Sequence, residues 1–163
     1  MLKILEDILE NDQIDYYHNL AKVQIDSEDL ELPKKKDGYR NWYTRHILTE
    51  NESSIIKSRL EKQGIINNIF KFTNAWINIV NENTNKNDSY HKDNSDRTII
   101  VYLNDNFSGG EFEYLKEGEA STINPRKGLC LLMDNELLHK VNPVISGTRH
   151  SLVIFIKKEK TLL

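Results

Sequence analysis

The sequence contains a single cysteine, Cys130, and this scarcity excludes several classes of protein. A disulfide framework, a structural zinc finger and a CxxC redox motif each require at least two cysteines. A chain without disulfides is typical of a reducing compartment, so we expect this protein to be cytoplasmic.

Long apolar runs and an excess of one charge are also missing. No stretch approaches the roughly 18–20 uninterrupted apolar residues of a membrane span, and the N-terminal segment MLKILEDILEND carries too many charges for a signal peptide. The 22 Lys and Arg nearly balance the 25 Asp and Glu, which gives a net charge of −3. No strong field therefore attracts nucleic acid or an anionic membrane, and we expect neither as a partner.

The length of the chain and the pattern of its first half predict one domain that begins with helices. A chain of 163 residues can bury enough surface for one core without metal or disulfide staples, so we expect a single domain over residues 1–163. Apolar residues recur at helical spacing over 2–10 and predict an amphipathic helix there. The capping-box pattern Thr49-x-x-Glu52 predicts the start of a second helix, with Gly64 as its stop.

The second half of the chain has the pattern of short strands. Segment 65–72 fits either a further helical turn or an extended piece, since periodicity does not separate the two. From Ala75 onward, runs rich in Ile, Val, Leu and Phe alternate with clusters of Gly, Asn, Asp and Pro. This order predicts a mostly β, α+β fold, in which helical support over 1–72 backs a double-stranded β-helix (jelly-roll) core over 75–157. The expected strands lie near residues 75–80, 98–104, 110–115, 119–124, 128–134, 138–145 and 148–157.

The candidate chemistry begins at His91 and Asp93. In an extended chain, residues i and i+2 point to the same face, so both side chains can reach one cation. His139, in the apolar run LLHKVNPV, adds a second imidazole, although a histidine in such a run is more often a packed core residue. Together the three side chains form a two-histidine, one-carboxylate set, which is typical of non-haem Fe(II) oxygenases.

Arg149 lies in the last predicted strand, where it shares one face with Ser151 and Val153. A buried guanidinium needs an anion, and no acid neighbours it in this strand. Because the guanidinium fork matches a carboxylate bidentately, a bound dicarboxylate is the natural partner. Tyr102 could donate its hydroxyl to the same carboxylate, with simple packing as the alternative.

The complete order of these motifs resembles the 2-oxoglutarate- and Fe(II)-dependent dioxygenases, in particular the prolyl 4-hydroxylase-like group. The similarity runs from about Trp76 to Lys157, through YHKDNSDRTIIVYLND, SGGEFEYL, MDNELLHKVNPV and TRHSLVIF. The resemblance implies that the catalytic set consists of iron ligands and of residues that bind the distal carboxylate of 2-oxoglutarate. The iron ligands would be His91, Asp93 and His139, and the carboxylate-binding residues Arg149 and Tyr102, with Ser151 matching the Arg-x-Ser pattern.

The resemblance also implies an activity, namely hydroxylation of prolyl residues in a peptide or protein. Its cofactors would be Fe(II), 2-oxoglutarate and O2, with ascorbate (vitamin C) as a candidate reductant and succinate and CO2 as co-products. Asn81 and Asp88 stand where family members often carry aromatic residues, so the substrate stays open. The alternatives are a hydroxylase of a free amino acid, a small metabolite or a nucleobase, and a non-catalytic jelly-roll module that binds a metal as structure.

The basic and aromatic segment 34–46, KKKDGYRNWYTRH, is a candidate for a mobile cover over the site. It could bind an acidic peptide or stack nucleobases, and the alternative is a solvated loop whose aromatic residues pack on the core. The candidate substrate-binding residues are Arg40, Trp42 and Tyr43 in this segment, and Arg97 further along. A monomer is the simplest state at this size, although an edge strand over 110–115 could pair with a second copy.

Overall fold

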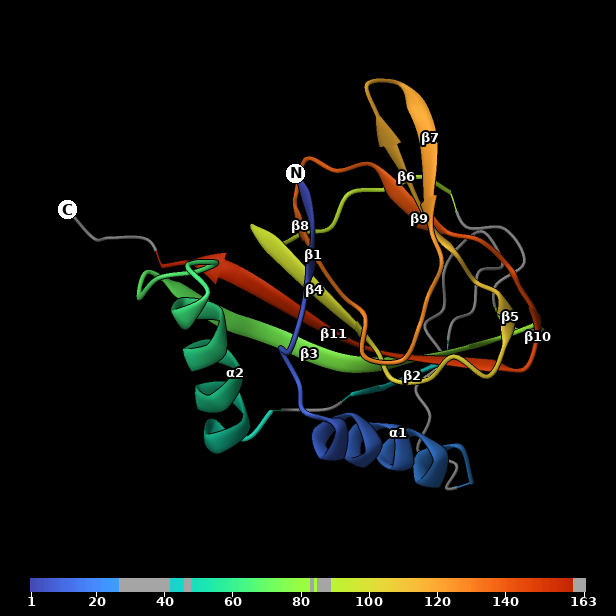
Figure 1. The fold of residues 1–163 in the computed structure, drawn as a ribbon, viewed down its shortest axis with the longest axis horizontal. Coiled ribbons are helices and arrows are strands. Elements are labelled where there is room, and N and C mark those ends of the chain that lie inside the picture. Colours follow the sequence, from blue (N-terminus) through green and yellow to red (C-terminus); the bar gives the residue numbers. More distant parts are fainter. Residues whose placement is uncertain (27–41, 46–47, 83, 85–88, 160–163) are drawn as a thin grey trace.

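A computed structural model of the chain describes residues 1–26, 42–45, 48–82, 84 and 89–159 (Figure 1). Two helices, α1 (Asn11–Asp26) and α2 (Glu50–Lys62), precede most of the strands. Neither helix combines the length and apolarity that a membrane-spanning helix requires, as far as the described residues go.

The strands form three sheets. The six-stranded major sheet consists of β1 (Leu2–Leu5), β8 (Cys130–Asp134), β4 (Arg97–Tyr102), β11 (Thr148–Lys158), β3 (Phe70–Asn81) and β2 (Trp42–Arg45), in this spatial order. The minor sheet has the order β7 (Glu119–Ile123), β6 (Phe112–Lys116), β9 (His139–Val141), and β10 (Val144–Ser146) pairs with β5 (Ser108–Gly109). All these pairings are antiparallel.

The major sheet separates two apolar cores. The helices lie on one side of it and the minor sheet on the other (Figure 1). Alternation along each strand sends successive side chains to opposite faces. The core on the helix side includes Ile14 and Tyr17 of α1, Ile56 and Leu60 of α2, and Leu152, Ile154 and Ile156 of β11. The core between the sheets includes Tyr102, Phe112, Leu129, Leu131, Met133 and Leu137. The predicted mostly β jelly roll backed by helices is therefore confirmed.

The second predicted helix begins where the capping box placed it. The Thr49 hydroxyl accepts from the Glu52 backbone N–H at 3.2 Å, and the Glu52 carboxylate accepts from the Thr49 backbone N–H at 2.7 Å. The helix ends at Lys62, and Gly64 follows with a φ of +68°, a conformation that favours glycine.

The predicted helix over 2–10 is wrong. Residues Leu2–Leu5 instead form β1, which pairs with β8 at the edge of the major sheet. A short apolar run matches both the helical and the extended repeat of apolar residues. Here the backbone pairing with the edge of β8 makes the segment a strand. Ile8 and Leu9, which follow β1, are buried in the helix-side core. The first helix of the chain is α1, which the sequence analysis did not predict.

Most predicted strands are present, with shifted ends. The expected strand at 75–80 is the longer β3, and the start of β3 resolves the C-terminal end of segment 65–72 as extended. The expected strand at 138–145 divides into β9 and β10. In the candidate cover, 34–46, residues 42–45 form β2, whose backbone pairs with β3. The rest of the cover lies outside the described residues.

Candidate active site

Two histidines lie side by side at the β9 edge of the minor sheet. His91 forms an isolated antiparallel bridge with His139, with backbone N–H to carbonyl distances of 2.9 and 3.1 Å. Residues directly opposite each other in an antiparallel pair project their side chains to the same face. Accordingly, the two imidazole centroids lie 4.5 Å apart.

Asp93 completes this cluster from the same segment as His91. Its Oδ1 atom lies 3.9 Å from His91 Nε2 and 3.8 Å from His139 Nε2. One potential ligand atom from each of the three residues falls within 4.8 Å of the others, which is a spacing that could hold one metal ion. The spacing of two residues in an extended segment predicted this convergence.

The ring orientations suit metal binding. In both histidines, Nδ1 lies 3.0 Å from a backbone carbonyl oxygen, that of Ser89 for His91 and that of Leu137 for His139. A carbonyl only accepts hydrogen bonds, so Nδ1 carries the proton and Nε2 presents its lone pair. This tautomer is the one that metal-binding histidines use when the other ring nitrogen is held by an outer partner.

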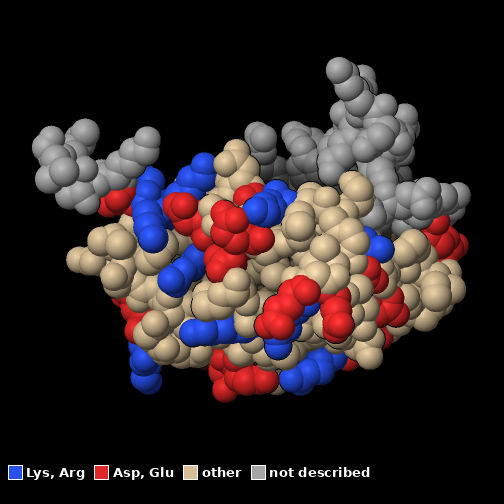
Figure 2. Space-filling model, turned by 90° about the horizontal axis from the view of Figure 1, so that it is seen from above, with Lys and Arg blue, Asp and Glu red and all other residues tan. Residues whose placement is uncertain are grey.

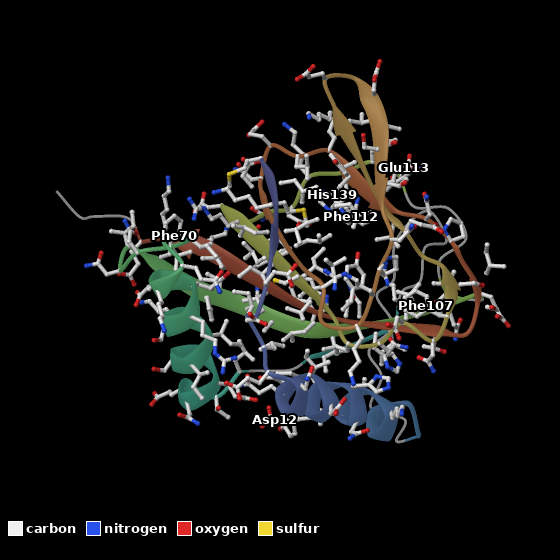
Figure 3. All side chains as sticks on the ribbon, in the orientation of Figure 1. Asp12, Phe70, Phe107, Phe112, Glu113 and His139 are labelled. Carbon is white, nitrogen blue, oxygen red and sulfur yellow. The ribbon has the colours of Figure 1, made fainter. Side chains whose placement is uncertain are left out.

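The cluster is closed on one side and open on the other. The side chain of His139 is 5% exposed, whereas that of His91 is 42% exposed. Phe112 of β6 stacks on His139 with a centroid distance of 5.2 Å and an interplanar angle of 21°, and the two lie together inside the jelly roll (Figure 3). Among the described residues, the more open approach to the cluster is therefore from the His91 side.

A second group of polar side chains is buried on the floor of the jelly roll. Ser151 of β11 lies opposite Tyr102 of β4, and Arg149 lies two residues before Ser151 on the same face. All three are almost fully buried. The Arg149 guanidinium carbon lies 5.8 Å from the centre of the Tyr102 ring, and one Nη atom donates to the Gly110 carbonyl at 3.2 Å.

This group has the chemistry of a carboxylate site. Among the described residues, the hydroxyls of Tyr102 and Ser151 are buried and have no hydrogen-bond partner. Leaving such groups unsatisfied costs about 1–3 kcal/mol each, so a ligand with acceptor atoms would recover this energy. Burial raises the pKa of Tyr102, while the Arg149 charge opposes the rise, so the hydroxyl keeps its proton as a donor.

Gly110 gives the Arg149 side chain its space. Its φ is +70°, and an added Cβ would lie 3.1 Å from Val144, 3.4 Å from Phe107 and 3.4 Å from Cδ of Arg149. A larger residue would strain the backbone and press on the guanidinium stem. Gly110 belongs to the motif SGGEFEYL, but this contact is not visible in the sequence because the residues that create it are distant along the chain.

The structure does not bring Arg97 to the site. Arg97 and Tyr102 lie on opposite faces of β4, and Arg97 faces the helix side of the sheet. There its guanidinium donates to the Ile65 carbonyl and lies 4.6 Å from the centre of the Phe70 ring. Figure 3 shows Phe70 far along the sheet from His139. The predicted substrate role of Arg97 therefore lacks support.

The other candidate substrate residues are described only in part. Arg40 lies outside the described residues. The backbone of Trp42 and Tyr43 pairs with Ile79 and Asn78 of β3.

Charges of both signs lie on the face of the molecule that is seen from above, among the described residues. Figure 2 shows Lys and Arg intermixed with Asp and Glu over the face seen from above, among the described residues drawn there. This pattern agrees with the nearly balanced composition, in which the net charge is −3.

A jelly roll that holds two imidazoles and a carboxylate together, beside a buried arginine, defines the class of the 2-oxoglutarate-dependent iron oxygenases. The sequence profile described as the 2OG-Fe(II) oxygenase superfamily matches residues 77–157, and the chain belongs to this superfamily. Members require Fe(II), 2-oxoglutarate and O2.

Known proteins similar to the chain support the same class. The 2-oxoglutarate and iron-dependent oxygenase domain-containing protein 3 of Rattus norvegicus is 38% identical over 64 residues, which cover 36% of this chain and 20% of the relative. The match thus spans about a fifth of that relative's length.

Two solved structures share the fold at low sequence identity. A Pseudomonas putida prolyl-4-hydroxylase has a TM-score of 0.78 and 15% identity, over 96% of this chain and 92% of that one. The carbocyclase SnoK from nogalamycin biosynthesis has a TM-score of 0.73 and 12% identity, over 96% and 79%.

Proposed function

We propose that this oxygenase hydroxylates prolyl residues in a peptide or protein and releases succinate and CO2. The observation that carries the proposal is the convergence of His91, Asp93 and His139 within 4.8 Å. The prolyl substrate is supported by the order of motifs and by the similarity in fold to the bacterial prolyl-4-hydroxylase. We further propose that the helices and the jelly roll act as one domain, because they share the helix-side core.

The three residues of the cluster would hold the iron. Two neutral imidazoles and one carboxylate leave coordination positions open for other ligands, as in non-haem iron oxygenases. When bound, Fe(II) supplies the oxygen activation that couples 2-oxoglutarate decarboxylation to hydroxylation of a C–H bond. The carbonyls of Ser89 and Leu137 keep both rings in the ligating tautomer.

The buried group on the sheet floor would hold 2-oxoglutarate by its distal carboxylate. Arg149 would supply the charge and the fork of donors, and the hydroxyls of Tyr102 and Ser151 would donate to the same oxygens. These buried side chains belong to the paired strands β4 and β11, so they are held in place before the ligand arrives. Such preorganisation reduces the entropy lost on binding.

The experiment is an incubation of the protein with Fe(II), 2-oxoglutarate, ascorbate and a proline-rich peptide. We expect one mole of succinate for each mole of peptide that gains 16 Da, with the added oxygen on proline. The Asp93→Ala variant should lose both signals while its circular dichroism is retained, because Asp93 belongs to neither of the two apolar cores.

Other outcomes point to the alternative functions. Succinate formed without peptide hydroxylation would favour a small-molecule or nucleobase substrate, and a shared fold with the carbocyclase SnoK makes this the second candidate. No succinate under any condition would indicate the non-catalytic module and contradict the proposal.

A further inference from the structure

The outer face of the minor sheet carries a charged network directly behind the histidine pair. Glu113 of β6 lies opposite Lys140 of β9, and their carboxylate and ammonium groups are 3.2 Å apart. The Tyr90 hydroxyl donates to the same Glu113 oxygen, and Lys140 Nζ lies 5.1 Å from the centre of the Tyr90 ring. Because Lys140 follows His139 and Tyr90 precedes His91, the network involves the chain neighbour of each histidine.

This network is more sheltered than an ordinary surface ion pair. The side chain of Glu113 is 17% exposed and that of Lys140 is 25% exposed. The Tyr90 hydrogen bond, together with bonds from Lys140 and Asn142, holds the pKa of Glu113 below its usual value, so Glu113 is a carboxylate that accepts several donors. A partly buried, charge-assisted network is stronger than a neutral hydrogen bond in water.

The network acts on the segment that carries two of the three proposed metal ligands. This segment joins the minor sheet through the backbone bridge of His91 to His139. The Tyr90 side chain adds a second attachment, to β6, on the opposite face of the sheet from the imidazoles. One attachment in the plane of the sheet and one on its outer face restrict both the position and the rotation of the segment.

We propose that Tyr90, Glu113 and Lys140 form a clasp that holds the His91–Asp93 segment in its ligating position and thereby strengthens binding of a divalent metal. The inference rests on the proposed function, because it assumes that His91, Asp93 and His139 bind Fe(II). The three residues are positioning residues, since they act on the metal only through the ligands. A segment that is already ordered loses less conformational entropy when the metal binds.

The chain offers a matched control on the same segment. Lys92 forms an ion pair with Glu136 at 2.7 Å, but the two side chains are 46% and 74% exposed. Exposed pairs contribute little because water and salt screen them. Lys92→Met therefore removes an attachment of similar type from the same segment without touching the clasp.

The experiment measures Mn(II) affinity in the metal-free full chain, with free Mn(II) detected by electron paramagnetic resonance. Tyr90→Phe removes only the hydroxyl and keeps the ring beside Lys140. We expect its Kd for Mn(II) to rise about tenfold, in line with the effect of outer-shell partners on metal sites. Lys92→Met should change the Kd less than about twofold. Glu113→Gln keeps an acceptor for Tyr90 and should give an intermediate value.

A melting curve of each metal-free variant separates positioning from general stability. The clasp predicts that Tyr90→Phe leaves the metal-free Tm close to that of the wild type while the Kd rises. An unchanged Kd in Tyr90→Phe, an equal rise in Lys92→Met, or a Kd rise that follows a fall in Tm would each overturn the clasp. Wild type that binds Mn(II) with the expected variant pattern but makes no succinate would refute only the proposed function. Wild type that binds no Mn(II) would refute both.

Discussion

Arg149 lies in the floor of the jelly roll, where its backbone pairs with β3 at Val80 and its guanidinium donates to the Gly110 carbonyl. We expect Arg149→Ala to weaken 2-oxoglutarate binding by about 30-fold to several-thousand-fold. This range follows from roughly 2–5 kcal/mol for removing one partner of a buried charge pair, at about 1.4 kcal/mol per tenfold change. The measurement is the KM for 2-oxoglutarate in the succinate assay.

Arg97→Ala is the matched control for this measurement. Both residues are arginines of the same sheet, but Arg97 contacts Ile65 and Phe70 on the helix side. Its replacement should leave the KM for 2-oxoglutarate within about twofold of wild type, even if thermal stability falls. A change under threefold in Arg149→Ala, or equal changes in both variants, would contradict the assignment of the carboxylate site.

Single residues were predictable from the sequence where their spacing within one strand decides their direction. His91 and Asp93, or Arg149 and Ser151, share a face because they are two residues apart. Glu113 could not be found in this way, because its partners lie on other strands and their register is fixed only by the folded sheet. The same alternation could have removed Arg97 from the site, since it is an odd number of residues from Tyr102.

At the scale of elements, α1 and β11 meet through a pair of histidines. Nδ1 of His18 lies 2.9 Å from Nδ1 of His150, which is buried on the face of β11 opposite Arg149. Burial, together with the nearby charges of His18 and Lys22, lowers the pKa of His150 to about 4. Burial also lowers the pKa of His18.

These depressed pKa values predict a pH dependence of stability. The unfolded chain takes up a proton on His150 below its ordinary pKa of 6.5, whereas the folded chain does so only near 4. The free energy of unfolding should therefore fall as the pH drops from about 6.5 to about 4, by up to about 1.4 kcal/mol per pH unit from this group.

Urea unfolding at pH 7 and pH 5 tests this expectation. His150→Gln should lose less stability than wild type over that interval, because it removes the group that gains the proton on unfolding. An equal loss in both proteins would show that other groups cause the pH dependence.

Elements were predictable where local chemistry fixes their ends. The reciprocal bonds of Thr49 and Glu52 are local, so the start of α2 was found from sequence. The strand β1 was not found, because only its pairing with β8 distinguishes it from a helix. The helix α1 buries Ile14, Tyr17 and Ala21 at helical spacing, a signal that was present but hidden among polar residues.

For the whole molecule, the two halves of the site are held by different sheets. The cluster of His91, Asp93 and His139 belongs to the minor sheet, and the proposed carboxylate-binding residues belong to the major sheet. A ligand pair that contacts both groups should therefore stabilise the entire jelly roll. We expect Mn(II) with 2-oxoglutarate, each at about 100 times its Kd, to raise the Tm by about 10–20 °C in a thermal shift assay.

Succinate in place of 2-oxoglutarate provides the comparison, since it keeps a carboxylate for Arg149 but lacks the keto group. It should give a smaller increase. No increase with either compound in the presence of Mn(II) would argue against a ligand that joins the two sheets.

The backbone bridge between His91 and His139 fixes the direction in which the His91 imidazole points. Because faces alternate at every residue of an extended segment, adding or deleting one residue between His91 and Asp93 would turn one of these two side chains away from the cluster. The proposed metal site therefore requires that His91 and Asp93 stay an even number of positions apart along the chain.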